Sequence, residues 1–164
     1  MTQLGHRRTG VFWFNLVSTL VFPLAVQWAK RRQRKGLRQG RMLSPEEMRI
    51  ARSMGVREAQ RIRVIETDRI PLPGVGVLGL ASRIAGFHGS DPWGMSLGYA
   101  VFIRNGWAGS RQELLAHEFV HTAQFERMGG MRPYLVQYLR ECLTVGYSAS
   151  PMEQEAVRLS LGVR

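Results

Sequence analysis

The amino-acid sequence predicts an α+β fold, in which a small β-sheet packs on one central helix and further helices follow. Three observations support this prediction. Residues 114–124 contain His-Glu-x-x-His within a run that reads as a helix. Residues 61–67 and 95–104 alternate in the manner of β-strands. Residues 11–29 contain no charged side chain, which predicts an apolar N-terminal helix.

The central helix has sequence signals at both ends. A capping-box pattern at 110–113 begins it, and two glycines at 129–130 end it. Because residues four apart share a helical face, His117 and His121 can direct both imidazoles at one metal ion. Glu118 is too close in sequence to complete that site. It is well placed to take a proton from a metal-bound water.

The positive charge of the chain is confined to its N-terminal third. The 164 residues carry a formal net charge of +11. Residues 1–63 contain 14 Lys or Arg and three Glu, whereas residues 64–164 contain nine of each sign. The region of the motif is therefore neutral. This argues against a nucleic-acid-binding domain, in which basic side chains would cover the folded face.

The single cysteine, Cys142, excludes an intramolecular disulfide framework. Its neighbours Leu139 and Leu143 predict that it is a small buried residue rather than a catalytic thiol.

The uncharged run 11–29 has features of a membrane anchor. Nineteen residues at helical rise span roughly 28 Å, which matches a bilayer core. Trp13 and Trp28 lie near its two ends, as interfacial anchors do. We therefore expect an anchoring unit at 1–42 with a basic flank, and one globular domain at 43–164.

The basic residues around this run predict its orientation. Arg7 and Arg8 precede it, and seven Lys or Arg follow it within 30–41 without one acidic residue. The positive-inside rule then places the C-terminal domain in the cytoplasm. The same residues would attract anionic headgroups, so membrane lipids are expected partners of 11–41.

Two alternatives to a spanning helix remain open. Four residues recur at every fourth position and form a polar stripe, as on a helix that lies in the interface: Asn15, Thr19, Pro23 and Gln27. Arg7-Arg8 before an apolar run is also typical of an export signal, which would place the domain outside the cytoplasm.

Capping and turn residues predict further elements: a helix over 44–53, a turn at 105–106, a helix over 134–145 and a last helix that begins at 150–151. Residues 74–79 match G-x-G-x-x-G. Two prolines separate them from the preceding strand, and no acidic residue follows at the required distance, so we interpret them as a loop. His88 and Asp91 are interpreted as solvated loop residues.

A catalytic zinc site needs a third protein ligand beside the two histidines. After His121 the chain has no further His and no Asp. The candidates are four glutamates: Glu126, Glu141, Glu153 and Glu155. Glu126 would face away on the same helix, whereas Glu141 cannot be dismissed. Glu153 has an alternative role as the third helical residue of a capping box that starts at Ser150.

Residues 95–158 resemble the gluzincins, zincin-like metallopeptidases in which a downstream Glu completes the His-Glu-x-x-His site. The segment looks most like small bacterial zincin-like domains, in which a strand like 97–103 precedes Leu-Ala-His-Glu-x-x-His-x-x-Gln and Pro-x-Glu-x-Glu-Ala follows. The resemblance implies a zincin-like fold, bound zinc, and Glu153 rather than Glu155 as the third ligand. One departure is Val157, where many relatives have an acidic or amide residue that supports the site.

The resemblance also implies hydrolysis of peptide bonds. Zinc would activate water, and Glu118 would accept its proton and return it to the leaving amine. Strand 97–103 would line the cleft and pair with an extended peptide. Tyr138 and Tyr147 are candidates for stabilising the oxyanion. The competing hypothesis is a non-catalytic zinc-binding domain tethered to a membrane, and the acidic residue at 118 favours catalysis over it.

Overall fold

The computed structural model describes the backbone of residues 5–73 and 92–163, with side chains from residue 21 onward in these ranges. The described part of the chain forms five α-helices, one short 3-10 helix and a mixed sheet of four strands. The α+β class is therefore confirmed. The predicted loop at 74–79, together with His88 and Asp91, lies outside the described residues.

The sheet has the strand order β1-β2-β4-β3. Its strands are β1 (Arg41–Met42), β2 (Arg63–Thr67), β3 (Gly94–Leu97) and β4 (Ala100–Arg104). β2 and β4 pair in parallel at the centre, whereas β1 and β3 pair antiparallel to them. β3 is thus an edge strand among the described strands.

The prediction of one strand over 95–104 was wrong, because this segment forms two strands, β3 and β4, that pair as a hairpin. Gly98 is in the turn with φ of 62°, a conformation that L side chains rarely adopt. Across this turn, the side chains no longer alternate between the two faces of the sheet as they would in one continuous strand. Leu97 packs with Phe102 on one face of the sheet, whereas Val101 belongs to the core on the other face. As a result β4 is inside the sheet, and β3, not β4, is available at its edge.

Most helices agree with the sequence signals. They are α2 (Pro45–Ser53), α4 (Arg111–Arg127), α5 (Met131–Val145) and α6 (Pro151–Ser160). The capping box of α2 is complete, because Ser44 and Glu47 bond reciprocally to each other's backbone N–H. The predicted strand 61–67 begins two residues later than expected, because Ala59–Arg61 forms the 3-10 helix η1.

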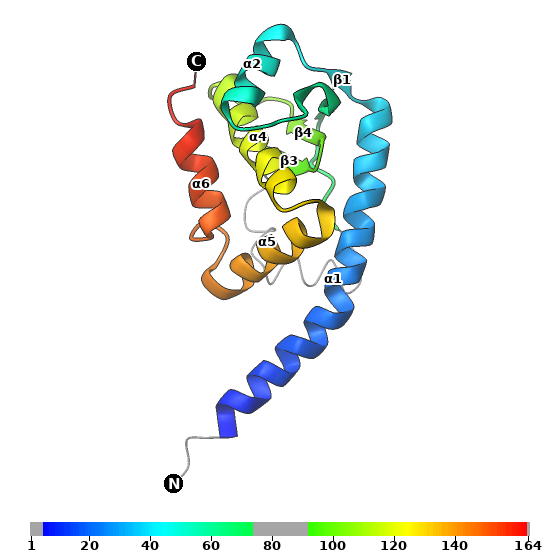
Figure 1. The fold of residues 1–164 in the computed structure, drawn as a ribbon, viewed down its shortest axis with the longest axis vertical. Helices are drawn as coiled ribbons and strands as arrows, with labels where there is room; N and C mark the ends of the chain where they lie inside the picture. The colour runs from blue at the N-terminus through cyan, green and yellow to red at the C-terminus, as the bar shows by residue number, and fades with distance from the viewer. Residues whose placement is uncertain (1–4, 74–91, 164) are drawn as a thin grey trace.

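Helix α1 (Gly5–Gln39) runs along one side of the molecule, and its N-terminal half extends away from the other elements (Figure 1). Its C-terminal half packs against the sheet and α5. Gly36 permits this close approach, since a Cβ at that position would lie 2.8 Å from the Cβ of Ala100. α1 therefore contains both the apolar run and the basic flank in one continuous helix.

The two faces of the sheet have different partners. One face packs on α2 and α4 through a core that includes Val64, Val101 and Phe119. The other face packs on α1 and α5 through Ala29, Phe102 and neighbouring residues. The described residues contain no helix with both the length and the apolar character required to cross a bilayer. The division of the chain at 42/43 remains a prediction, and α1 from residue 21 contributes to the second core.

Candidate metal centre

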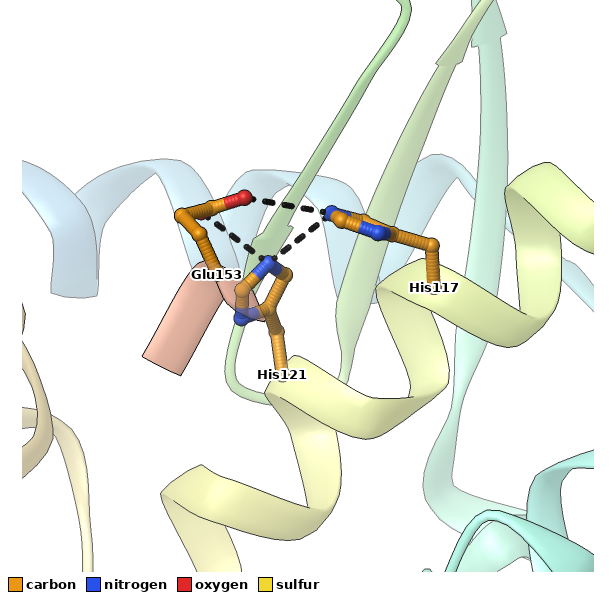
Figure 2. Close-up of side chains that lie close together, drawn as sticks. All are labelled: His117, His121 and Glu153. Carbon is orange, nitrogen blue, oxygen red and sulfur yellow. Dashed lines mark hydrogen bonds and ion pairs between the residues drawn. The ribbon is translucent and has the colours of Figure 1, made fainter. Parts of the chain in front are cut away.

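Three predicted ligands converge at one point (Figure 2). His117 and His121 project from α4, and Glu153 projects toward them from the first turn of α6. The Nε2 atoms of the histidines are 3.2 Å apart. Oε2 of Glu153 lies 3.4 Å from Nε2 of His117, and its Oε1 lies 3.2 Å from Nε2 of His121. These residues form a group that could hold a metal ion.

The ligand atoms lie close enough together to share one metal ion. The Nε2 atoms of His117 and His121 are 3.2 Å apart, near the separation of about 3.3 Å expected of two tetrahedral zinc ligands. The two contacts of Glu153 are made by different oxygens, Oε2 to His117 and Oε1 to His121, so its carboxylate faces both imidazoles. Two imidazole nitrogens and a carboxylate are also a common donor set of catalytic zinc.

The local fold frees Glu153 for this role. The capping box expected at Ser150 does not form, because the Ser150 side chain makes no cap hydrogen bond. Instead Glu141, on α5, accepts hydrogen bonds from the Ser150 hydroxyl at 2.8 Å and from the Met152 N–H at 3.0 Å. Glu141 thus caps α6 and is not placed in the histidine group.

The other two candidate glutamates also have partners elsewhere. Glu126 is buried and accepts hydrogen bonds from the backbone N–H groups of Arg57 and Glu58. Glu155 forms an ion pair with Arg127 at 2.7 Å. Of the four glutamates proposed from spacing, only Glu153 therefore reaches the histidines among the described contacts.

The imidazole of His121 is held from behind by Gln124. Its Nδ1 lies 2.8 Å from Oε1 of Gln124, whose side chain is 1% exposed. The amide nitrogen of Gln124 donates to the Met152 carbonyl at 2.9 Å and to Glu155 at 2.8 Å. These two acceptors fix the amide so that its oxygen faces the imidazole. Nδ1 then carries the proton and Nε2 is left as the ligand atom.

Position 157 does not take part in this support. Val157 is 45% exposed and, among the described contacts, does not bond to the ligands. Gln124, three residues after His121 on the same helix, is the amide that orients the ligand. Its role was missed from the sequence, although the i, i+3 spacing from a ligand histidine is a signal for it.

Glu118 lies beside the group and is almost fully buried. The Ser96 hydroxyl is 2.8 Å from its carboxylate, which fixes the side chain on the β3 side of the helix. Gly94 makes room for it, because a Cβ there would lie 2.7 Å from Cδ of Glu118. Burial raises the pKa of Glu118, while the charges of His117 and His121 and the Ser96 hydroxyl oppose that rise. A carboxyl with a raised pKa suits proton transfer near neutral pH.

Without metal, His121 and Glu153 shift each other's pKa. Burial lowers the pKa of His121, but the hydrogen bond and charge of Glu153 outweigh it and raise the value to about 9. Burial raises the pKa of Glu153, but its bonds to the two histidines hold it well below its usual range. The stable metal-free form is thus a carboxylate paired with a protonated imidazole.

The tyrosines predicted near the site both face Glu153. The Tyr138 hydroxyl donates to Oε1 of Glu153 at 2.5 Å. Burial, followed by the negative charge of Glu153, raises the pKa of Tyr138 and of Tyr147. Both hydroxyls therefore stay protonated at neutral pH and remain hydrogen-bond donors. Cys142 is buried as expected, and burial raises the pKa of its thiol to about 12.

The group opens onto a cavity of about 490 Å³. His117, Glu118, His121 and Glu153 form part of its wall, and edge strand β3 forms another part. The strand expected to line the cleft, 97–103, does so only through Leu97 among its described residues, since β4 is inside the sheet. No family model, curated protein or solved structure matches this chain.

Proposed function

We propose that this protein is a membrane-associated, zinc-dependent metallopeptidase with a zincin-like fold, and that His117, His121 and Glu153 hold the zinc. The carrying observation is the convergence of two imidazole nitrogens 3.2 Å apart with a carboxylate whose oxygens lie 3.2 and 3.4 Å from them, beside the buried carboxyl of Glu118, which is not part of this group. Residues of this type at this spacing fit zinc better than calcium or magnesium, which prefer sites made of oxygen ligands.

Zinc, when bound, supplies a Lewis acid that activates water and polarises a carbonyl. Glu118 accepts the proton as the water oxygen bonds to the peptide carbonyl carbon. It then donates that proton to the leaving nitrogen as the C–N bond breaks. Ser96 and Gly94 hold the Glu118 carboxyl at the cavity wall. Tyr138 and Tyr147 both line the cavity and both hydrogen-bond to Glu153, so each is a candidate donor to the oxyanion.

A peptide substrate is supported by the position of β3. This edge strand borders both the cavity and Glu118, and its outer side can pair with an extended chain. Because β3 and the two histidines line the same cavity, we expect a segment that pairs with β3 to pass close to the histidines. A strand added there presents its backbone carbonyls, the reacting groups of peptide hydrolysis, to the site.

Membrane association is proposed from α1. Its first half extends away from the remaining elements (Figure 1) and contains most of the uncharged run. Five basic side chains follow on its exposed surface: Lys30, Arg31, Arg34, Lys35 and Arg38. These can contact anionic headgroups, which favours the cytoplasmic side for the domain.

The second candidate function is a non-catalytic zinc-binding domain, which the complete ligand group by itself would equally support. The burial of Glu118 favours the peptidase over this second candidate. A carboxyl that neither ligates nor forms an ion pair costs free energy when buried, and a purely structural site has no use for it.

The test uses the purified 164-residue chain. Metal content is measured by mass spectrometry, and cleavage is measured on a mixture of unstructured peptides. We expect about one zinc per chain in the wild type. His117→Ala and Glu153→Ala should lose zinc and activity, whereas Glu118→Gln should keep zinc and lose activity. Glu46→Gln, at an exposed glutamate of α2 outside the cavity lining, is the control and should keep both zinc and activity.

Zinc retained by Glu153→Ala would refute the ligand assignment. Full zinc with no cleavage of any peptide would support the non-catalytic function. Vesicle flotation with and without anionic lipid tests membrane association separately, and absence of flotation in both cases would contradict it.

A further inference from the structure

Part of the wall of the cavity at the metal centre comes from the N-terminal helix α1. Four residues of α1 line it: Val21, Phe22, Ala25 and Trp28. They come from the same apolar run that predicts a membrane anchor. Another part of the wall is provided by α5, through Leu135, Leu139 and Leu143. The two histidines and Glu153 thus lie in a site whose other walls are largely apolar.

The charges in the cavity are one-sided. Its described lining includes three acidic residues, Glu113, Glu118 and Glu153, and no Lys or Arg, although the chain has a net charge of +11. Glu113 is partly engaged, since it accepts the backbone N–H of Gly162. Away from the metal-binding group, the described lining therefore offers a substrate carboxylate no Lys or Arg, and burial of an unpaired carboxylate is strongly unfavourable.

We propose that α1 forms part of the substrate-binding site, and that the site takes the interior of a polypeptide with a bulky apolar side chain next to the scissile bond. This inference rests on the proposed peptidase function and adds its substrate class. The cavity volume of about 490 Å³ accommodates a large side chain together with the adjoining backbone. Acidic side chains of the substrate are disfavoured in the apolar part of this cavity.

Residues of α1 therefore determine specificity. Phe22 is 7% exposed and Trp28 is partly buried, so an apolar side chain of the substrate contacts surface that is already shielded from water. Differences of one methylene in such a pocket change selectivity by roughly tenfold or more. Truncation of either aromatic residue removes several contacting carbons. It should lower kcat/KM for bulky substrates far more than for small ones.

The experiment compares quenched fluorescent peptides that are identical except at the positions flanking the scissile bond. Those positions carry Phe, Leu, Ala or Asp, and the peptides are made with free and amidated ends. The zinc-loaded chain should prefer Phe and Leu over Asp by roughly a hundredfold. Phe22→Ala and Trp28→Ala should each reduce the Phe-over-Ala preference by roughly tenfold.

Leu24→Ala is the matched control. Leu24 is on the same helix, is 46% exposed and is not among the residues that line the cavity. It should leave the preference unchanged. Zinc content and thermal unfolding are measured for each variant, and Trp28→Ala remains informative if Phe22→Ala does not fold. Equal effects of all three variants, or a preference for Asp, would overturn the inference.

Binding to Glu118→Gln separates this inference from the proposed function. Fluorescence anisotropy of the same peptides reports binding without turnover. If Glu118→Gln binds Phe peptides selectively while the wild type cleaves nothing, the peptidase function fails and the binding site stands. If the wild type cleaves all peptides equally, the function stands and the inference fails. If no peptide is bound or cleaved, both fail.

Discussion

The side-chain oxygen of Gln124 lies 2.8 Å from Nδ1 of His121, and the amide nitrogen of the same residue bonds to α6, the helix that carries Glu153. One buried amide therefore orients a histidine ligand and also ties its helix to the helix of the carboxylate ligand. Gln124 can therefore hold the His121 tautomer only while α4 and α6 keep their present separation.

Replacing Gln124 should weaken zinc binding without removing a ligand. We expect Gln124→Leu to lower zinc affinity by about 10- to 100-fold, because His121 loses the acceptor that orients it. Competition with a chromophoric chelator measures the change. Gln60→Leu, at an exposed glutamine on η1, is the control and should bind zinc like the wild type. Equal affinities for both variants would contradict the role given to Gln124.

Adding one methyl group at Gly94 should impair catalysis but not zinc binding. The new Cβ would occupy the space of the Glu118 carboxyl, which must move away from Ser96. We expect Gly94→Ala to lower kcat by roughly tenfold or more, in line with loss of positioned proton transfer. Zinc content should stay the same as in Glu118→Gln. A loss of zinc, or an unchanged kcat, would show that Gly94 does not act through Glu118.

Removal of the Glu141 carboxylate should loosen the start of α6. It accepts the Ser150 hydroxyl and the Met152 N–H, and both donors would be left unpaired. We expect Glu141→Ala to reduce the free energy of unfolding by about 1–2 kcal/mol, the effect of a lost helix cap. Urea denaturation of the metal-free chain measures it. Arg140→Ala, at the exposed neighbouring position, should change stability by much less.

Zinc affinity should increase with pH. The pKa of His121 in the metal-free chain is raised to about 9 from the ordinary 6.5. That proton must leave before Nε2 can bind zinc. The apparent affinity should therefore rise between pH 6.5 and 9, by up to about tenfold per pH unit for one released proton. Chelator competition at three pH values tests this, after correction for the chelator's own protonation, and a flat profile would contradict it.

The same pKa values predict the opposite trend for stability without metal. A raised pKa of His121 stabilises the metal-free fold below about pH 6.5, and this contribution is lost as the pH rises through about 9. The lowered pKa of Glu153 stabilises the fold above its ordinary value of 4.5, and this contribution is lost as the pH falls. His121 and Glu153 together should therefore stabilise the metal-free fold most between about pH 4.5 and pH 6.5. Denaturation of the chelator-treated chain at several pH values measures this contribution. A pair contribution that peaks at alkaline pH would refute this.

Packing of α1 on the sheet should be sensitive to the side chain at position 36. A Cβ on Gly36 would meet Ala100 at 2.8 Å and the ring of Phe102 at 3.1 Å. We expect Gly36→Val to destabilise the fold by about 1–3 kcal/mol through overpacking. Lys35→Val, at an exposed site on the same turn, controls for the low helix propensity of valine. Equal effects at both positions would indicate that α1 does not contribute to the stable fold.

Sequence patterns predicted the features that depend on interactions between residues close together in the chain. The spacing of His117 and His121 within a capped helix follows from the geometry of one helical turn, and the start of α2 follows from reciprocal bonds between Ser44 and Glu47. These features involve residues a few positions apart. They could therefore be predicted without knowledge of the fold.

Local patterns misled where a tertiary contact decided the outcome. Glu153 and Ser150 have the spacing of a capping box, yet Glu141 from α5 takes the cap. The alternation over 95–104 suggests one strand, yet a left-handed Gly98 folds it into a hairpin. The uncharged run suggests an anchor alone, yet four of its residues, Val21, Phe22, Ala25 and Trp28, also line the cavity.

The sequence by itself determined the α+β class, the histidine pair, the neighbouring Glu118 and a short set of candidate third ligands. Only the tertiary structure brought Glu153 to the histidines and turned Glu126, Glu141 and Glu155 to other partners. It also placed Gln124 behind His121 and α1 beside the cavity. The physical reason is that a ligand set depends on distances between helices, and those distances are fixed by packing between residues far apart in the chain.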